Sequence, residues 1–266
     1  MLISISRSCR FSPSCGLIAF AMLIATMTNA DAAEPIADAP VATQPVLNKS
    51  SQSTAKKKVA PNVEAPLVPP REGRSETIQL FNGKDLDGWI GHKKYWSVKE
   101  GVIVGKSTEA VPVSTYLLTK RDFSDFRLLV TCKLVEQEIH SGIAFWGRIA
   151  PEHGDEFTYA GHLVMFPSKW GLYDLFGREG LTSDKRRRSR KAGHQHDWNE
   201  LEILAQGNRI RLVVNGKPTM DWRDPEPERI KEAPIGLQLH DESPQEVHFK
   251  NLILTTFPED NLTTVK

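Results

Sequence analysis

The feature that most constrains the fold of this chain is an alternation of apolar and polar residues across positions 198–256. Residues 201–205 and 210–214 each carry an apolar side chain at every second position, which is the two-residue period of a half-buried β-strand. A Gly-Asn dipeptide lies between the two runs and an Asn-Gly dipeptide follows the second, and both tolerate the positive φ angles of tight hairpin turns. Two further runs, 235–240 and 246–257, follow without a helical pattern. The pattern therefore predicts an all-β fold, a β-sandwich.

The run IGLQLH, residues 235–240, gives the first indication of function. Alternate residues of a strand face opposite sides of the sheet, so the apolar residues point to one side while Gly236, Gln238 and His240 point to the other. On the concave side of a curved sheet, an amide and an imidazole beside a glycine would form a polar platform open to a ligand. The other interpretation is the water-facing side of an ordinary antiparallel sheet.

The composition is that of an ordinary globular protein. The chain has 266 residues, of which 39% are hydrophobic and 25% charged, and its net charge of +1 gives no reason to expect nucleic acid as a partner. Three cysteines are too few for a disulfide framework, and two of them precede the predicted domain. The third, Cys132, lies in an apolar run with the parity of Leu128 and Val130, which predicts a buried and unreactive thiol.

The N-terminal region is predicted to be a targeting segment followed by a linker. Residues 1–32 contain two arginines, an apolar stretch and small residues before a cleavage point, which are the parts of a secretory signal peptide. The apolar stretch is short for a permanent membrane anchor, so we expect no transmembrane segment after cleavage. Residues 33–75 are rich in Pro, Ala, Ser and Lys and contain no aromatic residue, which predicts a disordered linker. We expect an exported protein, periplasmic or extracellular, whose linker spaces the domain from an envelope surface or partner.

Eight motifs occur in the order that is typical of one family. They are LFNGKDLDGW (80–89), WSVKEGVIVG (96–105), LLTKRDFSDFRLLV (117–130), SGIAF (141–145), DWNELEI (197–203), VVNG (213–216), IGLQLH (235–240) and VHFKNLIL (247–254). Together they resemble the 3-keto-disaccharide hydrolase domain family. The resemblance places the folded domain at residues 76–258 and leaves residues 259–266 as a C-terminal tail.

The resemblance implies a concanavalin A-like jelly roll of two antiparallel sheets with a sugar site on the concave sheet. It also implies cleavage of glycosides whose sugar has been oxidised at C3. A ketone at C3 acidifies the proton on C2, so a base can remove that proton and the enolate can expel the leaving group from C1. Addition of water to the resulting enone completes a net hydrolysis. Such a site needs a base near C2, a hydrogen-bond donor or positive charge near the C3 oxygen, and an acid near the glycosidic oxygen.

The chain departs from the family pattern at three polar positions. Many members have Asn before Ser-Gly-Ile, Arg shortly after it and Glu in a following strand, where this chain has His140, Trp146 and His162. These changes fall on the face that is expected to carry chemistry, because the strand period puts Ala144, Trp146 and Arg148 on one side of their strand and His162, Val164 and Phe166 on one side of theirs. Two interpretations remain open: a site rebuilt for another substrate, or a carbohydrate-binding module that has lost catalysis. A third possibility is an interaction domain of the cell envelope, for which the linker is the indication.

Three residues are candidates for catalysis. His240 lies in the retained LQLH and can act as a base or a metal ligand, or it can hydrogen-bond to a neighbouring loop. His162 could replace the missing carboxylate as base, or it is a structural histidine. Asp174 could orient a histidine or bind a sugar hydroxyl, or it is a turn residue.

Five residues are candidates for substrate binding. Trp146 and Trp170 could stack on a sugar ring, although tryptophans pack into cores more often. Arg148 and Lys120 could steady an enolate or a carboxylated sugar, although long basic side chains usually lie in water. Gln238 belongs to the polar face of its strand.

Other chemistries have less support in the sequence. There is no pair of carboxylates at matching strand parity, so a conventional two-acid glycosidase mechanism is not expected. No zinc or nucleotide motif is present and no cofactor is predicted with certainty, although a divalent metal ion is possible. The basic run 184–191 could attract an anionic polysaccharide, or it is a solvated loop.

Overall fold

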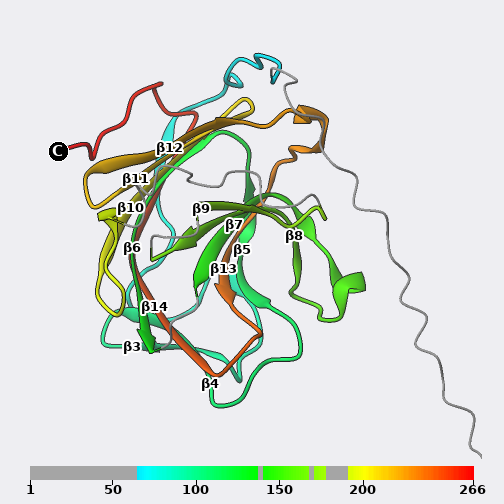
Figure 1. The fold of residues 1–266 in the computed structure, drawn as a ribbon, viewed down its shortest axis with the longest axis vertical. Helices are drawn as coiled ribbons and strands as arrows, with labels where there is room; N and C mark the ends of the chain where they lie inside the picture. Colours follow the sequence, from blue (N-terminus) through cyan, green and yellow to red (C-terminus); the bar gives the residue numbers. More distant parts are fainter. Residues whose placement is uncertain (1–64, 137–139, 168–170, 178–190) are drawn as a thin grey trace, which may run out of the picture. The chain divides into compact units, whose positions relative to one another are not determined.

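The computed structural model describes residues 65–136, 140–167, 171–177 and 191–266. Within these residues the strands form two antiparallel sheets, of eight and six strands, that face each other (Figure 1). The predicted all-β jelly-roll sandwich is therefore confirmed. The predicted signal peptide, residues 1–32, and the first part of the predicted linker, 33–64, lie outside the described residues. None of the helices in the described part of the chain is long and apolar enough to cross a membrane.

The strand order shows how distant segments come together. The larger sheet runs β12 (Lys217–Arg223), β11 (Arg209–Val214), β10 (Asn199–Gln206), β6 (Phe126–Glu136), β14 (Gln245–Thr256), β4 (Val102–Ser107) and β3 (Trp96–Lys99), with β1 (Glu76–Gln79) beside β14. The six-stranded sheet runs β2 (Trp89–Ile90), β5 (Thr115–Phe123), β13 (Ala233–Leu239), β7 (Ser141–Ile149), β8 (Tyr159–Phe166) and β9 (Gly171–Asp174). Among the described residues, two 3-10 turns connect strands, η1 (Pro151–His153) after β7 and η2 (Pro227–Arg229) after β12, and residues 191–192 are also helical.

The hairpin that the sequence pattern predicted most strongly is confirmed. β10 and β11 pair antiparallel, with Gln206 opposite Arg209 and the Gly-Asn dipeptide as the turn. Gly207 adopts φ +59°, the conformation that favours glycine at such a turn. Asn215, in the turn that follows β11, has φ 48°.

A single apolar core fills the space between the sheets. Leu128 and Ile203 from the larger sheet and Ile143 and Leu237 from the smaller one are fully buried in it. Burial of each such side chain contributes on the order of 1.5–3 kcal/mol to folding. Cys132 is also completely buried in this core, as the sequence predicted, and burial raises the pKa of its thiol well above the ordinary value.

The segment just before β1 packs against the domain through a buried carboxylate. Asp125 is 1% exposed and accepts hydrogen bonds from the backbone N–H groups of Arg71, at 2.7 Å, and Gly207, at 2.9 Å. The guanidinium of Arg71 forms an ion pair with the same carboxylate. Farther upstream, Val68 donates its backbone N–H to the side chain of Asn208. Residues 65–75, which the sequence analysis assigned to the linker, thus contact the folded domain.

Loss of the Asp125 carboxylate is expected to destabilise the domain. An Asp125→Ala change leaves two buried N–H donors and the Arg71 guanidinium without their acceptor, which predicts a loss of about 2–3 kcal/mol. Urea unfolding of the variant checks this value. Asp122→Ala, at an exposed position of the same segment, is the matched control and is expected to change stability by less than about 0.5 kcal/mol. Equal effects of the two changes would contradict the anchoring role.

The last residues of the chain, predicted as a tail, also pack on the larger sheet. Glu202 of β10 has a fully buried side chain whose carboxylate accepts hydrogen bonds from the backbone N–H groups of Thr263 and Thr264 and from both threonine hydroxyls. Arg127 of β6 completes its surroundings with an ion pair at 3.0 Å. Residues 259–266 therefore cover part of the side of the sheet that faces away from the core.

Candidate functional site

The six-stranded sheet carries a second set of packed side chains on the side turned away from the core. Tyr116, Leu118, Ala144, Leu163 and Met165 form this cluster, and all of them come from β5, β7 or β8. Their neighbours along the same strands belong to the core between the sheets. Since alternate residues face opposite sides, this cluster defines what we call the outer face, the side of the six-stranded sheet opposite the larger sheet.

A tyrosine and a glutamine form a polar pair on the outer face. Tyr116 of β5 lies directly opposite Gln238 of β13, and the Gln238 amide Nε2 donates a hydrogen bond to the Tyr116 hydroxyl at 3.2 Å. Both residues are 2% exposed and Gly236 and His240 are also buried, so the predicted polar platform is present but is not open to solvent. The Gln238 Oε1 is buried and has no hydrogen-bond partner among the described residues. Because the phenol oxygen accepts from Gln238, its own proton can be donated elsewhere, so the pair offers one donor and one acceptor.

The environment of Tyr116 keeps its hydroxyl neutral. Burial raises its pKa well above the ordinary value, the hydrogen bond from Gln238 offsets part of that rise, and the charge of Asp241 raises it further. A neutral phenol is a hydrogen-bond donor and not a base at physiological pH. An unmet buried acceptor such as the Gln238 oxygen costs on the order of 1–3 kcal/mol, which a ligand hydroxyl would recover.

Two histidines meet at the end of β13. His240 follows the last residue of the strand, is 8% exposed, and packs edge-on against the ring of His140 with centroids 4.5 Å apart. His240 Nδ1 lies 3.3 Å from the Glu242 backbone N–H and 3.4 Å from Asp241 Oδ1, so the ring faces a donor and a carboxylate on this side. Gln245 holds the pair together, because its side chain accepts from the His240 backbone N–H and donates to the His140 carbonyl. This arrangement can present an N–H donor beside a second imidazole.

His162 and Asp174 are brought together, but on the opposite side of the sheet from Tyr116. His162 is fully buried, with its Nε2 2.6 Å from Asp224 Oδ2, and its ring packs among Phe145, Trp146, Phe176 and Trp222. Asp174 is paired opposite His162 in the β8–β9 ladder and is 2% exposed. The predicted parity of His162 with Val164 and Phe166 is correct, but those residues face the core. The expectation that His162 lies on the chemistry-bearing face is therefore corrected.

The His162–Asp224 pair is expected to act on stability. An Asp224→Ala change leaves a fully buried imidazole without its partner and is expected to destabilise the domain by about 3 kcal/mol. Chemical denaturation measures the loss in the free energy of unfolding. The affinity of the folded protein for a saccharide should stay unchanged. Asp221→Ala, which removes a half-exposed carboxylate on β12, serves as the control. A fully stable Asp224→Ala protein would show that the pair is dispensable for folding.

A β-bulge overturns the predicted facing of Trp146. The sequence pattern placed Ala144, Trp146 and Arg148 on one side, but the β7–β8 register shifts between Phe145 and Arg148, and Trp146 adopts φ 54°. The bulge turns the indole into the core, where it is completely buried and donates to the Ser124 carbonyl. Its ring therefore has no exposed face on which a sugar could stack.

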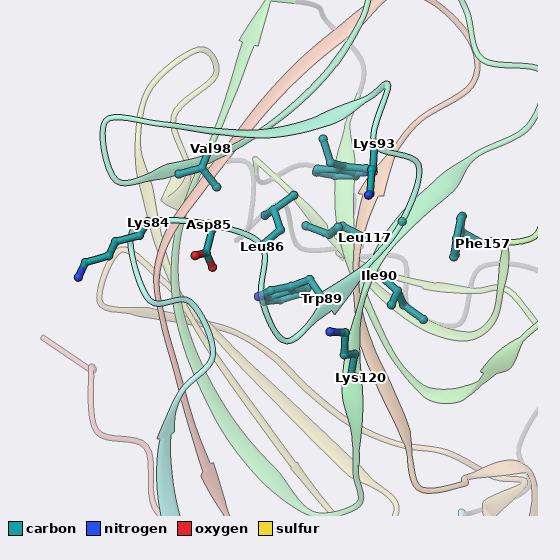
Figure 2. A pocket seen from close by; sticks show the side chains of 12 residues that line it. Lys84, Asp85, Leu86, Trp89, Ile90, Lys93, Val98, Leu117, Lys120 and Phe157 are labelled. Atoms are coloured by element: carbon teal, nitrogen blue, oxygen red, sulfur yellow. The ribbon is translucent and has the colours of Figure 1, made fainter.

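The basic candidates lie on the surface. Arg148, near the end of β7, forms an ion pair with Glu152, and the hydrogen bond that its guanidinium donates to that carboxylate raises its pKa. Lys120 is exposed, and its Nζ lies 3.4 Å from Asp87 Oδ1. Lys120 also lines a cavity of about 800 Å³ beside β2, which is shown in Figure 2. Trp170 and residues 184–190 of the basic run lie outside the described residues.

The described residues do not assemble a metal site. No three of their histidine, cysteine, aspartate and glutamate side chains come close enough to hold an ion. The described residues therefore provide no set of ligands for the divalent ion that the sequence analysis considered possible.

Sequence reasoning missed Tyr116 and Asp224. Tyr116 lies in an apolar run that predicts a core strand, and only the pairing of β5 with β13 places it beside Gln238. Asp224 follows β12 and reaches His162 of β8 across a separation of 62 residues. The sequence around Tyr116 and around Asp224 is compatible with an ordinary strand or turn, so no local pattern identifies either residue as part of a polar pair.

Known structures share this architecture. A candidate glycosyl hydrolase from Parabacteroides distasonis ATCC 8503 aligns with a TM-score of 0.50 and 20% identity over 68% of this chain and 93% of that protein. A carbohydrate-binding module from Bacillus subtilis aligns with a TM-score of 0.43 and 15% identity over 62% and 93%, respectively. A β-glucanase from Bacillus licheniformis aligns with a TM-score of 0.42 and 13% identity over 70% and 99%. A search of curated proteins found no match.

The strand order and the two facing antiparallel sheets define the class as a jelly-roll β-sandwich domain. Within that class, the chain belongs to the family of 3-keto-α-glucoside-1,2-lyase-like domains, whose model matches residues 76–255. The match spans about two thirds of the sequence and confirms the family that the eight motifs predicted.

Proposed function

We propose that this domain binds glycosides oxidised at C3 on its outer face and cleaves them by elimination followed by hydration. A base removes the C2 proton, and the enolate so formed expels the C1 substituent, whose oxygen receives a proton. Water then adds a hydroxyl to C1 and a proton to C2 of the enone, so the net reaction is hydrolysis. Family membership supports this reaction type.

One observation carries the location of the site. The buried Tyr116–Gln238 pair presents an unused acceptor and an available donor proton at the end of the sheet where His240 lies. Adjacent donors and acceptors are what the hydroxyl and carbonyl groups of a sugar require. In the proposal, the Tyr116 hydroxyl donates to the C3 oxygen as negative charge develops there, and Gln238 accepts from a neighbouring hydroxyl.

The two imidazoles divide the proton transfers. His240 is assigned as the acid that protonates the departing C1 oxygen; it would act as the imidazolium, with the Asp241 carboxylate 3.4 Å from its Nδ1. His140, packed against it, is assigned as the base that removes the C2 proton. Each role is expected to contribute about 10²–10⁴-fold to the rate.

The test uses matched substrates. The purified domain is incubated with 3-keto glucosides and with the same glucosides unoxidised, while the enone absorbance and the released aglycone are followed. The proposal predicts turnover of the 3-keto compounds alone. Gln238→Leu, which removes the acceptor while keeping the volume, is expected to weaken substrate binding about tenfold. Cleavage of unoxidised glycosides at the same rate would refute the proposed reaction.

A second candidate function is saccharide binding without turnover. It is favoured by the outer face of β8, where Gly161, Leu163 and Met165 provide no group that titrates near neutral pH. Calorimetric binding of a 3-keto glucoside with no product after prolonged incubation, and loss of that binding in Gln238→Leu, would establish this alternative.

The cellular location that we propose is the periplasm or the exterior, reached through the signal peptide of residues 1–32. The expected mature N-terminus is Ala33, which N-terminal sequencing of the exported protein checks. Recovery of the whole chain from the cytoplasm with Met1 intact would contradict export.

A further inference from the structure

The cavity beside β2 is separate from the proposed saccharide site. Its walls come from residues 84–98 together with Leu117, Lys120 and Phe157, and none of them is Tyr116, Gln238 or His240. We call it the edge pocket, because β2 and β3 are the edge strands of the two sheets. Its volume of about 800 Å³ lies in the range of about 300–1,000 Å³ that is typical of small-molecule sites.

The floor of the edge pocket is apolar and aromatic. Trp89, Trp96 and Leu117 are core residues that also line the pocket, so its floor is a part of the core that the edge strands leave uncovered. Figure 2 shows Leu86, Leu117 and Trp89 gathered at the centre, with lysines around them. Such a surface suits an apolar body and gives a freely hydrated ion no partner.

The two indole N–H groups of this floor differ. Trp89 Nε1 donates to the Leu80 carbonyl at 2.8 Å, so its hydrogen bond is made within the fold. Trp96 Nε1 is buried and has no acceptor among the described residues. A buried donor without an acceptor is uncommon in folded proteins.

The charges on the rim favour an anion. Lys84, Lys93 and Lys120 line the edge pocket with one carboxylate, that of Asp85. This carboxylate already accepts from Asn82 Nδ2 at 2.7 Å and from a backbone N–H at 3.0 Å, and the Asn82 bond lowers its pKa. Lys120 lies 3.4 Å from Asp87 Oδ1, whereas Lys84 and Lys93 form no ion pair within the described residues, so these two lysines give the rim its excess of positive charge.

We infer that the edge pocket binds a small organic anion that has an apolar body. The apolar part lies over Trp89 and Leu117, and the acid group, a carboxylate or sulfonate, lies among the three lysines. The sequence offered Lys120 as a candidate for steadying an enolate or a carboxylated sugar; in this inference it would instead meet the acid group of the anion in the edge pocket.

The test uses 1-anilinonaphthalene-8-sulfonate as the probe, with N-phenyl-1-naphthylamine as its neutral counterpart. Both fluoresce in apolar surroundings, so their fluorescence on titration with the protein measures binding. The sulfonate is expected to bind at least about tenfold more tightly than the amine. The double change Lys84→Gln/Lys93→Gln should weaken sulfonate binding about tenfold and leave amine binding unchanged.

Controls separate this site from general surface binding and from the saccharide site. Lys217→Gln/Lys231→Gln removes two exposed lysines elsewhere and should not change sulfonate binding. Val98→Phe, which narrows the edge pocket from β3, should weaken both probes, with the melting temperature recorded to confirm folding. His240→Ala should leave probe binding intact even if it abolishes turnover, so this inference and the proposed function can fail independently.

Competition identifies the apolar body. Displacement of the probe by decanoate indicates an alkyl chain, and displacement by naphthalene-2-carboxylate indicates an aromatic ring; either supports the inference. Equal binding of sulfonate and amine, equal losses in the two lysine double variants, or displacement by naphthalene-2-carboxamide as strong as by the acid would overturn it.

Discussion

Replacement of His240 by alanine is expected to lower kcat/KM on 3-keto alkyl glucosides by about 10²–10⁴-fold, because the departing alkoxide then has no proton donor. The same change should have a much smaller effect on 3-keto nitrophenyl glucosides, since nitrophenolate leaves without protonation. His140→Ala should instead slow both substrates alike, because the C2 proton must be removed in either case. Steady-state kinetics of the two variants on the two substrates checks the assignment.

The control for this prediction is another histidine of the same domain. His248 of β14 is hydrogen-bonded to Glu246 at 2.8 Å on the eight-stranded sheet, so His248→Ala should leave both rates unchanged. If His240→Ala retains full activity on alkyl substrates while folding normally, the imidazole is not the acid, and proton donation must be sought elsewhere.

Replacement of Glu202 by alanine is expected to destabilise the domain by about 5 kcal/mol, the largest effect on stability that the structure predicts. The change leaves the Arg127 guanidinium without its ion-pair partner and removes the acceptor for the N–H and hydroxyl groups of Thr263 and Thr264. Glu200→Ala is the matched control on the same strand. The Glu200 carboxylate is exposed and forms a long ion pair of 3.5 Å with Lys266 Nζ, so its loss should change stability little. Urea unfolding of both variants measures the difference.

The Glu202 contribution should depend on pH with a defined sign. Burial raises the pKa of this carboxyl, but the hydrogen bonds from Thr264 and Thr263 outweigh burial and lower it below the ordinary value of 4.5. A carboxyl with a depressed folded-state pKa stabilises the fold above the unfolded value, and that stabilisation is lost as pH falls through the folded value. The gap between wild type and Glu202→Ala should therefore be full at pH 7 and shrink in acid. A gap that is constant with pH would assign the effect to packing and not to charge.

The sequence predicts the fold well because strand periodicity is local. The alternation in residues 201–214, the turn at Gly207 and the burial of Cys132 all follow from neighbours in the chain, and all are confirmed. The family motifs then supply the order of the strands, which no local pattern contains.

The site was predictable only in part, because facing and pairing depend on distant residues. A one-residue bulge reverses the side that Trp146 occupies, and no feature of SGIAFWGR announces it. His162 was aligned with a carboxylate of the family, yet the parity of β8 directs it to the core, where Asp224 meets it. The polar pair of Tyr116 and Gln238 needs the register of β5 against β13, which is set by the whole sheet.

The buried Cys132 gives the domain a built-in reporter of its own opening. Cys132 lies on β6 with its sulfur packed in the core between the two sheets, so an alkylating reagent reaches it only when that core opens. The rate at which the reagent labels the peptide that contains Cys132 would thus measure how often the native domain opens, without a fluorophore or added denaturant. In an oxidising environment the same burial prevents Cys132 from forming a disulfide with other thiols once the domain has folded. This protection requires that β10 and β14 pair with β6 soon after β6 is synthesised.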